Sequence, residues 1–200
     1  MRSTGLNHMF IALNNKIKPE DYLNSVKAFF LLNNVDSYEF PDDDKFARAF
    51  ASQEMYGKLT CRFILCRLET WNTRRIVTLD GLSVEHVFPV KPKRPEWGVP
   101  PGELLDTVGN LTLAHWKDNA ALSNKPFAEK LKMDQGYRKS GLSRLNEDIV
   151  NREKWGEEEI RYRGKELAKL ALKVWPYPRM KENEIAPFSE EPEPERSLQD

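Results

Sequence analysis

Ser83-Val84-Glu85-His86-Val87-Phe88-Pro89 is the stretch that decides the fold of this 200-residue chain. Its alternating character predicts a short strand that ends near His86. A second short strand is predicted at Asn110-Leu111-Thr112-Leu113, 24 residues after His86, and Asn119 follows 9 residues later near a helix start. This order predicts a ββα unit, in which a strand-end imidazole and a helix-borne amide face one small cavity.

Helices are predicted on both sides of this unit. Before it, Pro19-Glu20-Asp21 marks a helix start, and Pro41-Asp42-Asp43-Asp44 breaks that helix and opens the next. Ile76-Val77-Thr78-Leu79 is a short β-branched run before the turn signal Asp80-Gly81. After the unit, helices are predicted near residues 142–150 and over residues 157–174, where Trp175-Pro176 ends the last one. The expected fold class is α+β and mainly helical, with a short two-stranded antiparallel hairpin plus a helix embedded among α-helices.

These patterns predict four segments along the chain. They are a helical preamble over 1–75, a ββα core over 76–135, C-terminal helices of the same domain over 136–176, and an acidic, proline-rich, disordered tail over 177–200.

Composition indicates a globular protein. Hydrophobic residues make up 40% of the chain, which is enough for a normal core. The longest apolar runs, such as residues 28–32, are far shorter than the roughly 20 residues of a membrane span, and no apolar signal region follows Met1. We therefore expect a cytoplasmic protein with no membrane contact. Cys61 and Cys66 lack the paired spacing of a zinc site, which favours two buried thiols on a core helix.

Net charge is uneven although its total is zero. Residues 177–200 carry three basic and seven acidic residues, a net charge of −4, so residues 1–176 carry +4. A mildly basic body is compatible with DNA binding but does not require it.

The residue types in the predicted cavity suit phosphodiester hydrolysis. That reaction needs a base for the attacking water, a cation at the phosphoryl group, and a group that orients the base. Histidine titrates near neutral pH, as a base requires. Oxygens of Asn and Glu are hard ligands for Mg²⁺, which needs only one or two protein ligands.

Three segments together resemble the C-terminal nuclease domain of GmrSD-type restriction proteins, which are modification-dependent (type IV) systems. They are residues 83–89, residues 105–113 and the run Asn119-Ala120-Ala121-Leu122-Ser123-Asn124-Lys125-Pro126-Phe127-Ala128-Glu129-Lys130. The resemblance extends from Tyr56 to Trp175-Pro176, and the combination of motifs is far more specific than any one of them.

The resemblance implies an HNH-type (His-metal-finger) DNA endonuclease with a ββα-metal core that restricts foreign, possibly modified DNA. By position, His86 matches the general base and Asn110 the central Asn. Glu85 matches the first metal-ligand position, and Asn119 matches the metal ligand on the helix. The implied cofactor is a divalent metal, Mg²⁺ or Mn²⁺, and the implied partner is double-stranded DNA. The family's separate N-terminal half, which binds nucleotide and drives recognition, would be a further partner or a separate subunit. The 200 residues contain no G-x-x-x-x-G-K-[ST] loop.

Each of these residues also has a simpler interpretation. Strand alternation points Glu85 and His86 to opposite faces, so Glu85 can instead have an orienting or surface role. Asn110 orients His86 or its loop, or else stabilises a turn. Asn119 can be a helix cap instead of a ligand. His86 itself can be a satisfied structural histidine.

Candidate DNA contacts lie beside the core. Lys91, Lys93 and Arg94 directly follow the His86 strand, where they can track a DNA backbone or form a solvated loop. Asn124 and Lys130 are candidates for phosphate or structural contacts, and otherwise for a solvated helix face.

Two alternatives to the nuclease stay open at this point. A catalytically inactive DNA-binding module would bind DNA in a salt-dependent way without cleavage. A helical partner subunit of a larger restriction complex would use its helices for association.

Overall fold

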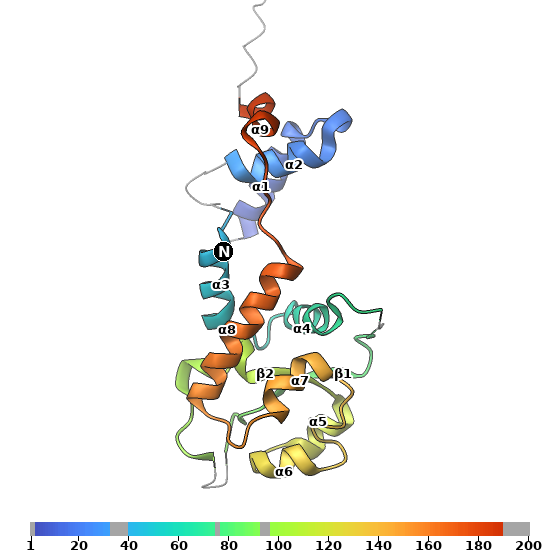
Figure 1. Ribbon diagram of the computed structural model, residues 1–200, viewed down its shortest axis with the longest axis vertical. Coiled ribbons are helices and arrows are strands. Elements are labelled where there is room, and N and C mark those ends of the chain that lie inside the picture. The colour runs from blue at the N-terminus through green and yellow to red at the C-terminus, as the bar shows by residue number, and fades with distance from the viewer. Residues whose placement is uncertain (1–2, 33–39, 75–76, 93–96, 190–200) are drawn as a thin grey trace, which may run out of the picture. The chain divides into compact units, whose positions relative to one another are not determined.

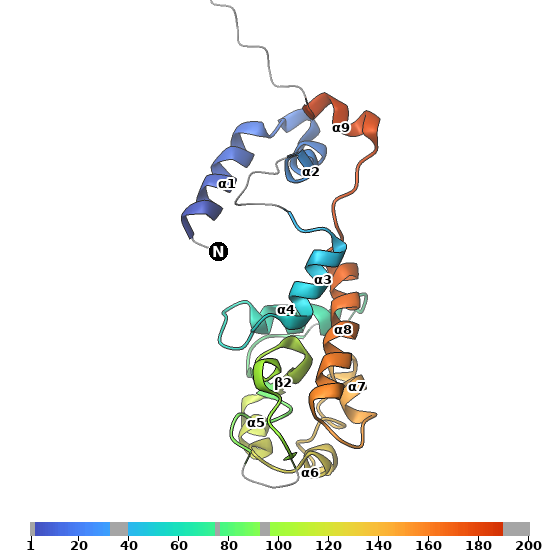
Figure 2. The same cartoon turned by 90° about the vertical axis from the view of Figure 1, so that its left-hand side faces the viewer.

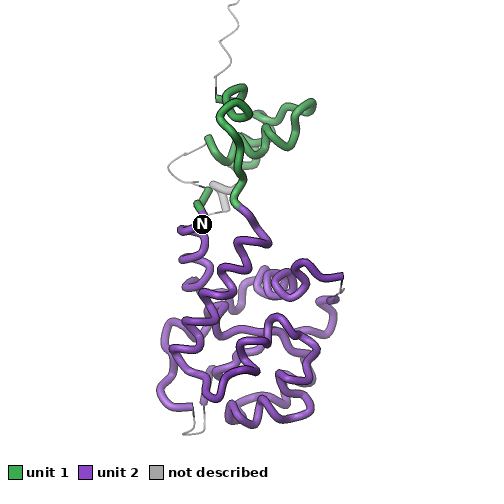
Figure 3. Tube along the Cα trace, in the orientation of Figure 1, with its two compact units in different colours: residues 1–42, 177–200 green, residues 43–176 purple. Residues whose placement is uncertain are grey.

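The computed structural model describes residues 3–32, 40–74, 77–92 and 97–189 (Figure 1). The chain divides into two compact units, formed by residues 1–42 with 177–200 and by residues 43–176 (Figure 3). The second unit contains both the expected core and the expected C-terminal helices. The expected preamble over residues 1–75 is divided between the two units. No helix of the described chain is both long enough and apolar enough to cross a membrane.

The first unit is helical. It contains α1 (Ser3–Lys16), the short 3-10 helix η1 (Pro19–Asp21), α2 (Tyr22–Leu32) and α9 (Glu182–Ser189). Helix α9 packs against α2 and lies within the segment for which the sequence predicts a disordered tail. Glu184 explains its start, because its Oε2 accepts the Lys181 backbone N–H at 2.8 Å and acidic residues favour a helix N-terminus. Residues 190–200 lie outside the described residues.

The second unit holds the sheet and the remaining helices. Its helices are α3 (Asp43–Ser52), α4 (Cys61–Thr70), α5 (Trp116–Leu122), α6 (Phe127–Lys132), α7 (Ser143–Val150) and α8 (Glu157–Val174). Helix α8 lies alongside α3 although the two are distant in sequence, as the views of Figures 1 and 2 agree. Cys61 and Cys66 are both buried free thiols on α4, as the sequence predicts.

The sheet consists of two antiparallel strands, β1 (Leu82–His86) and β2 (Leu111–His115). The register pairs Leu82 with His115 at one end and His86 with Leu111 at the other. The antiparallel pair is confirmed, but a long connection joins its strands. Residues 77–79, part of the β-branched run before the turn, lie outside both strands, and Ile76 lies outside the described residues. Gly81 adopts a positive φ of 76° just before β1, which fits the predicted turn.

Helix α8 follows its predicted pattern. Its first turn carries three glutamates, and Glu159 Oε2 accepts the Gly156 backbone N–H at 3.0 Å, so the N-terminus is capped. Its apolar stripe is buried at Ile160, Leu167, Ala171 and Val174, and Leu170 is half-buried. The helix ends at Val174, before Pro176.

Two clusters of buried side chains form the core of the second unit. One joins α3, α4, β2 and α8 and includes Leu65, Leu68, Leu113 and Ala171. The other lies under the loop that follows β1, where Val87 and Phe88 pack with aromatic and aliphatic side chains from later segments. The residues that follow His86 are therefore anchored in a core rather than in a free loop.

Arg163 connects α8 to the segment before β2. It is fully buried, and its Nη1 donates to the carbonyls of Val108, Gly109 and Leu111 at 3.0, 2.8 and 2.9 Å. Its Nη2 donates to the Leu145 carbonyl at 2.9 Å. This guanidinium thus fixes the 3-10 turn η4 (Val108–Asn110), from which Asn110 projects.

Candidate active site

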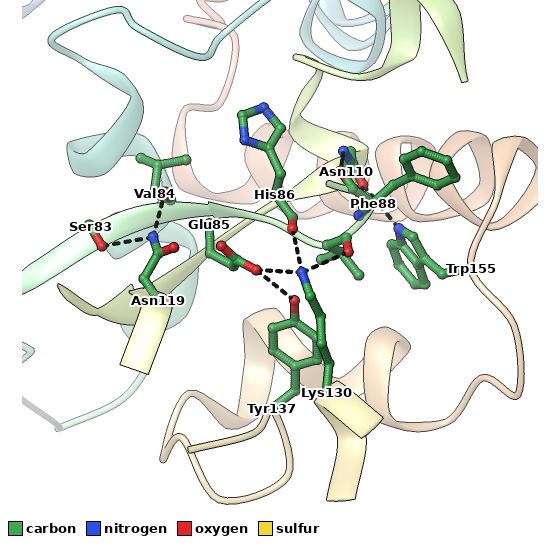
Figure 4. Close-up of polar contacts among 11 residues, drawn as sticks. Ser83, Val84, Glu85, His86, Phe88, Asn110, Asn119, Lys130, Tyr137 and Trp155 are labelled. Atoms are coloured by element: carbon green, nitrogen blue, oxygen red, sulfur yellow. Dashed lines mark hydrogen bonds and ion pairs between the residues drawn. The ribbon is translucent and has the colours of Figure 1, made fainter. Parts of the chain in front are cut away.

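The strand register brings His86 and Asn110 together. His86 ends β1 and is paired with Leu111, the first residue of β2, so Asn110 lies directly beyond that pair. Alternation along β1 sends His86 and Glu85 to opposite faces, and Figure 4 shows their side chains pointing away from one another.

His86 is held on two sides. It is 7% exposed, and its Nε2 lies 2.8 Å from Oδ1 of Asp106, whose side chain is 39% exposed. The ring of Tyr56 lies 4.2 Å from the imidazole, centroid to centroid, at a tilt of 53°. Within the described residues, Nδ1 of His86 makes no hydrogen bond. The arrangement leaves one ring nitrogen able to accept a proton.

Asn110 uses its whole side-chain amide to hold the residues after β1. Its Oδ1 accepts the Phe88 backbone N–H at 2.8 Å and the Trp155 Nε1–H at 3.0 Å. Its Nδ2 donates to the carbonyls of Phe88 and Leu105 at 3.0 and 2.9 Å. The side chain is fully buried, and all its described hydrogen bonds go to Phe88, Leu105 and Trp155. Asn110 therefore acts on the loop after His86 rather than on the imidazole.

Glu85 belongs to a buried polar cluster. Its Oε1 accepts hydrogen bonds from Lys130 Nζ at 2.7 Å and from the Tyr137 hydroxyl at 3.2 Å (Figure 4). Lys130 also donates to the carbonyls of His86 and Val87 at 3.1 and 3.2 Å, and its Nζ lies 5.6 Å from the Trp97 ring centre. The cluster ties α6 to the end of β1.

For Lys130 the sequence predicts a phosphate contact, a structural contact or a solvated helix face, and the structure contradicts the first and the last. The side chain is 0% exposed and is surrounded by acceptors from Glu85, His86 and Val87. Such an ammonium cannot leave its partners for a phosphate without stranding a buried carboxylate. Its place is in the framework of the site.

Burial changes the titration of all three side chains in this cluster. Burial raises the pKa of the Glu85 carboxyl, and the nearby Lys130 ammonium opposes that change. Burial likewise lowers the pKa of Lys130, and it raises the pKa of Tyr137 well above its ordinary value. The Glu85–Lys130 contact therefore depends on the hydrogen bonds that Tyr137 and the two carbonyls add to it.

Asn119 lies on the same face of β1 as Glu85. It is within α5, past the first turn, and its Nδ2 donates to Ser83 Oγ at 2.9 Å and to the Val84 carbonyl at 3.0 Å. It is therefore not the helix cap considered from sequence. The two bonds orient the amide so that its oxygen faces Glu85 (Figure 4).

The oxygens of Glu85 and Asn119 are of the chemical type that binds a hard divalent cation. Among the described residues, neither Oε2 of Glu85 nor Oδ1 of Asn119 receives a hydrogen bond, although Lys130 is the positive partner of the Glu85 carboxylate through Oε1. No group of three or more His, Cys, Asp or Glu side chains gathers as a metal cluster in the described part of the chain. Mg²⁺, however, keeps most of its waters and needs only one or two protein ligands.

Comparison with known families decides what this domain is. The sequence model of the family described as GmrSD restriction endonucleases, C-terminal domain, matches residues 40–170, well over half of the chain. The chain belongs to this family. No curated protein and no solved structure matches it.

Membership of the GmrSD C-terminal domain family makes this a restriction-endonuclease-related domain, and a nuclease family implies DNA as substrate. The matched residues include β1, β2, α5 and most of α8. The other residues that the sequence connects with DNA are Lys91, Lys93 and Arg94 of the basic loop, and Asn124 after α5. Lys91 is exposed and Asn124 is half-buried, while Lys93 and Arg94 lie outside the described residues.

Several residues of this GmrSD site were not assigned roles from sequence. Asp106 contacts His86, Tyr56 packs on it, and Trp155 and Tyr137 complete the networks of Asn110 and Glu85. Asp106 lies within a recognised segment but has no distinctive spacing from His86. Trp155 and Tyr137 come from distant segments, so only the fold brings them to the site.

Proposed function

We propose that this chain is a metal-dependent DNA endonuclease of the HNH type that restricts foreign, possibly modified DNA, with His86 as its general base. The observation that carries the proposal is the end of β1. There, an imidazole whose Nδ1 makes no hydrogen bond within the described residues lies on one face of the strand, and oxygens of Glu85 and Asn119 lie on the other (Figure 4). Membership of a restriction-endonuclease family supports the same chemistry.

In this proposal His86 takes the proton from the attacking water. Its ring is held by contacts on both sides, and Asn110 fixes the loop that follows it. Alternation separates His86 from Glu85 and Asn119, and Glu85 is buried, so the proposal requires the residues around the end of β1 to open before one phosphate contacts both faces.

We assign Oε2 of Glu85 and Oδ1 of Asn119 as the protein ligands of Mg²⁺ or Mn²⁺. When bound, the cation supplies charge neutralisation at the phosphoryl group and the leaving oxygen. Lys130 keeps Oε1 of Glu85 occupied, so the carboxylate would offer one oxygen rather than two. Ser83 and the Val84 carbonyl hold the Asn119 amide in the orientation that this role requires.

Recognition of a particular modification is assigned to a partner. We propose an N-terminal half or a separate subunit that binds nucleotide and selects DNA, with this domain supplying cleavage.

A plasmid assay tests the general base. Purified protein should nick or cut supercoiled plasmid with Mg²⁺ or Mn²⁺ and not with EDTA, on modified or unmodified DNA. His86→Ala should abolish cleavage, whereas His115→Ala, which removes an exposed imidazole at the end of β2, should not. Equal cleavage by His86→Ala and wild type would refute the assignment. Salt-dependent DNA binding with no cleavage in either metal would favour a non-catalytic DNA-binding module.

Asn119→Ala tests the metal ligands without stranding a buried charge. We expect the Mg²⁺ concentration for half-maximal cleavage to rise by about 10–100-fold, the range seen when support for a metal site is lost. Asn151→Ala, at an exposed position after α7, is the matched control and should leave the metal requirement unchanged.

A further inference from the structure

Asp106 is the acidic side chain in contact with His86. Its Oδ1 lies 2.8 Å from Nε2 of His86, within ordinary hydrogen-bond distance. The imidazole is nearly buried, whereas the carboxylate is partly open to solvent. Asp106 therefore approaches the ring from the solvent side, separate from the buried cluster of Glu85 and Lys130.

The backbone of Asp106 is itself fixed. Its carbonyl accepts the backbone N–H groups of Met55 and Tyr56 at 2.7 and 3.2 Å. An isolated antiparallel bridge pairs Glu54 with Thr107, and Thr107 Oγ1 donates to the Leu104 carbonyl at 2.8 Å. The carboxylate thus projects from a backbone that is pinned on both sides.

The same segment supplies the ring that packs on His86. Tyr56 donates its backbone N–H to the Asp106 carbonyl, and its ring lies 4.2 Å from the imidazole, centroid to centroid. Residues 55 and 56 therefore support both contacts of His86, the carboxylate and the ring. Because Asp106 contacts one ring nitrogen of His86 and Tyr56 packs against the ring, the imidazole has little freedom to rotate or flip.

An ionised carboxylate accepts hydrogen bonds and donates none, so its imidazole partner must donate. In neutral His86, Nε2 would then carry the hydrogen and Nδ1 would be the basic nitrogen. We propose that Asp106 is the positioning residue for His86, and that it holds the neutral imidazole as the Nε2–H tautomer so that Nδ1 takes the proton from water. The catalytic part of this inference rests on the proposed function, and the tautomer does not.

Nitrogen-15 NMR of the side chain tests the tautomer without any activity. In the metal-free full chain, neutral His86 should give the Nε2–H pattern, with His86→Ala identifying the signal. Asp106→Ala should give a mixture of tautomers, whereas Asp106→Glu should restore the Nε2–H form in part. Asp134→Asn, at an exposed carboxylate, should change nothing. An unchanged His86 pattern in Asp106→Ala would overturn the proposal.

Cleavage kinetics test the consequence. Asp106→Asn keeps the size of the side chain, and we expect a fall in kcat of about 10–100-fold with little change in KM for DNA. A shift in the Mg²⁺ requirement with an unchanged tautomer would instead identify Asp106 as a metal ligand and overturn the proposal. If wild type cleaves in no metal, the proposed function fails, while the NMR result still decides whether Asp106 sets the tautomer.

Discussion

Lys130 Nζ lies 2.7 Å from Oε1 of Glu85, and the two side chains are 0% and 6% exposed. A buried ion pair costs desolvation energy that only good geometry and added hydrogen bonds offset. Both are present, because Tyr137 donates to Glu85 and two carbonyls accept from Lys130. The pair is therefore a support for the end of β1, and breaking one side of it should be costly.

Lys130→Met should destabilise the fold by about 3–5 kcal/mol, because it leaves the Glu85 carboxylate buried and unpaired. Urea unfolding followed by circular dichroism measures the change. Lys125→Met is the matched control: it removes a partly exposed lysine that pairs with Glu129 four residues on, and it should cost about 1 kcal/mol or less. Similar losses from both variants would contradict this account.

The same variant should have an altered pH dependence. Burial raises the pKa of Glu85, and Lys130→Met removes the ammonium that opposes this effect. The folded state then binds a proton at higher pH than the unfolded state, so stability should rise as pH falls towards the ordinary carboxyl range. Unfolding at a series of pH values should show Lys130→Met approaching wild type on acidification.

Asn110→Ala should cost more than about 3 kcal/mol, since it leaves two donors and two carbonyls without their partner and each such buried group costs about 1–3 kcal/mol. Tryptophan fluorescence during denaturant unfolding is the measurement. Asn151→Ala, at an exposed position, should remain within about 0.5 kcal/mol of wild type. A tolerated Asn110→Ala would mean that this amide does not hold the loop.

Gly109 and Gly164 should respond in opposite ways to the same substitution. A Cβ on Gly109 would lie 2.2 Å from the Ile160 backbone oxygen, which no rotamer can relieve, so Gly109→Ala should lose at least about 1–3 kcal/mol. On Gly164 the nearest atom is the Ala51 oxygen at 3.4 Å, and alanine favours a helix, so Gly164→Ala should change stability by less than about 1 kcal/mol. Thermal unfolding distinguishes them, and equal shifts would count against the packing of η4 on α8.

The two cysteines should resist thiol reagents in the folded protein. Burial raises the pKa of Cys61 to about 11 and also raises the pKa of Cys66. Ellman's reagent at pH 8 should label them only after denaturation. Because unfolded Cys61 ionises at lower pH than folded Cys61, stability should fall as pH rises from the ordinary thiol pKa towards 11, and less so in Cys61→Ala. Rapid labelling of the native protein would refute this.

Lys91 should contribute to DNA binding through its charge if the proposed function holds. Lys91→Ala should reduce the slope of log affinity against log salt by about 1, the value for one phosphate contact. Fluorescence anisotropy with duplex DNA across salt concentrations measures it. Lys173→Ala, at an exposed lysine of α8, is the control, and an equal slope change in both would show a non-specific charge effect.

The sequence predicts those features that depend on local pattern. Alternation and apolar spacing place β1, β2 and α8 near their observed positions, and the order of His86, Asn110 and Asn119 predicts a ββα unit that the strand register supports. The burial of a polar side chain is harder to predict from the sequence pattern. Lys130 is a charged residue on a short helix, where a solvated position is the ordinary expectation, and only α6 packing under β1 makes it a buried partner of Glu85.

The features that the sequence does not predict depend on contacts between distant segments. Asp106 and His86 are 20 residues apart with no shared motif, and Asn110 and Trp155 are 45 apart. The run over residues 77–79 has β propensity but lies outside both strands. Helix α9 is a structured segment where the sequence predicts disorder. A hydrogen bond at its start and packing on α2 stabilise a helix in this acidic segment, which contains a proline.

The grip of Arg163 on the carbonyls around Asn110 also bears on when the domain becomes competent during synthesis. Residue 163 follows residue 110 by 53 positions, which a ribosome adds in about 3–10 s. Once residue 119 has been added, the nascent chain contains Glu85, His86 and Asn119. It still lacks the Trp155 indole, which completes the bonding of Asn110, and the Arg163 guanidinium, which shapes the turn before β2. If the proposed function holds, we expect a chain that ends before Trp155 to be inactive on DNA, because it lacks both of these supports.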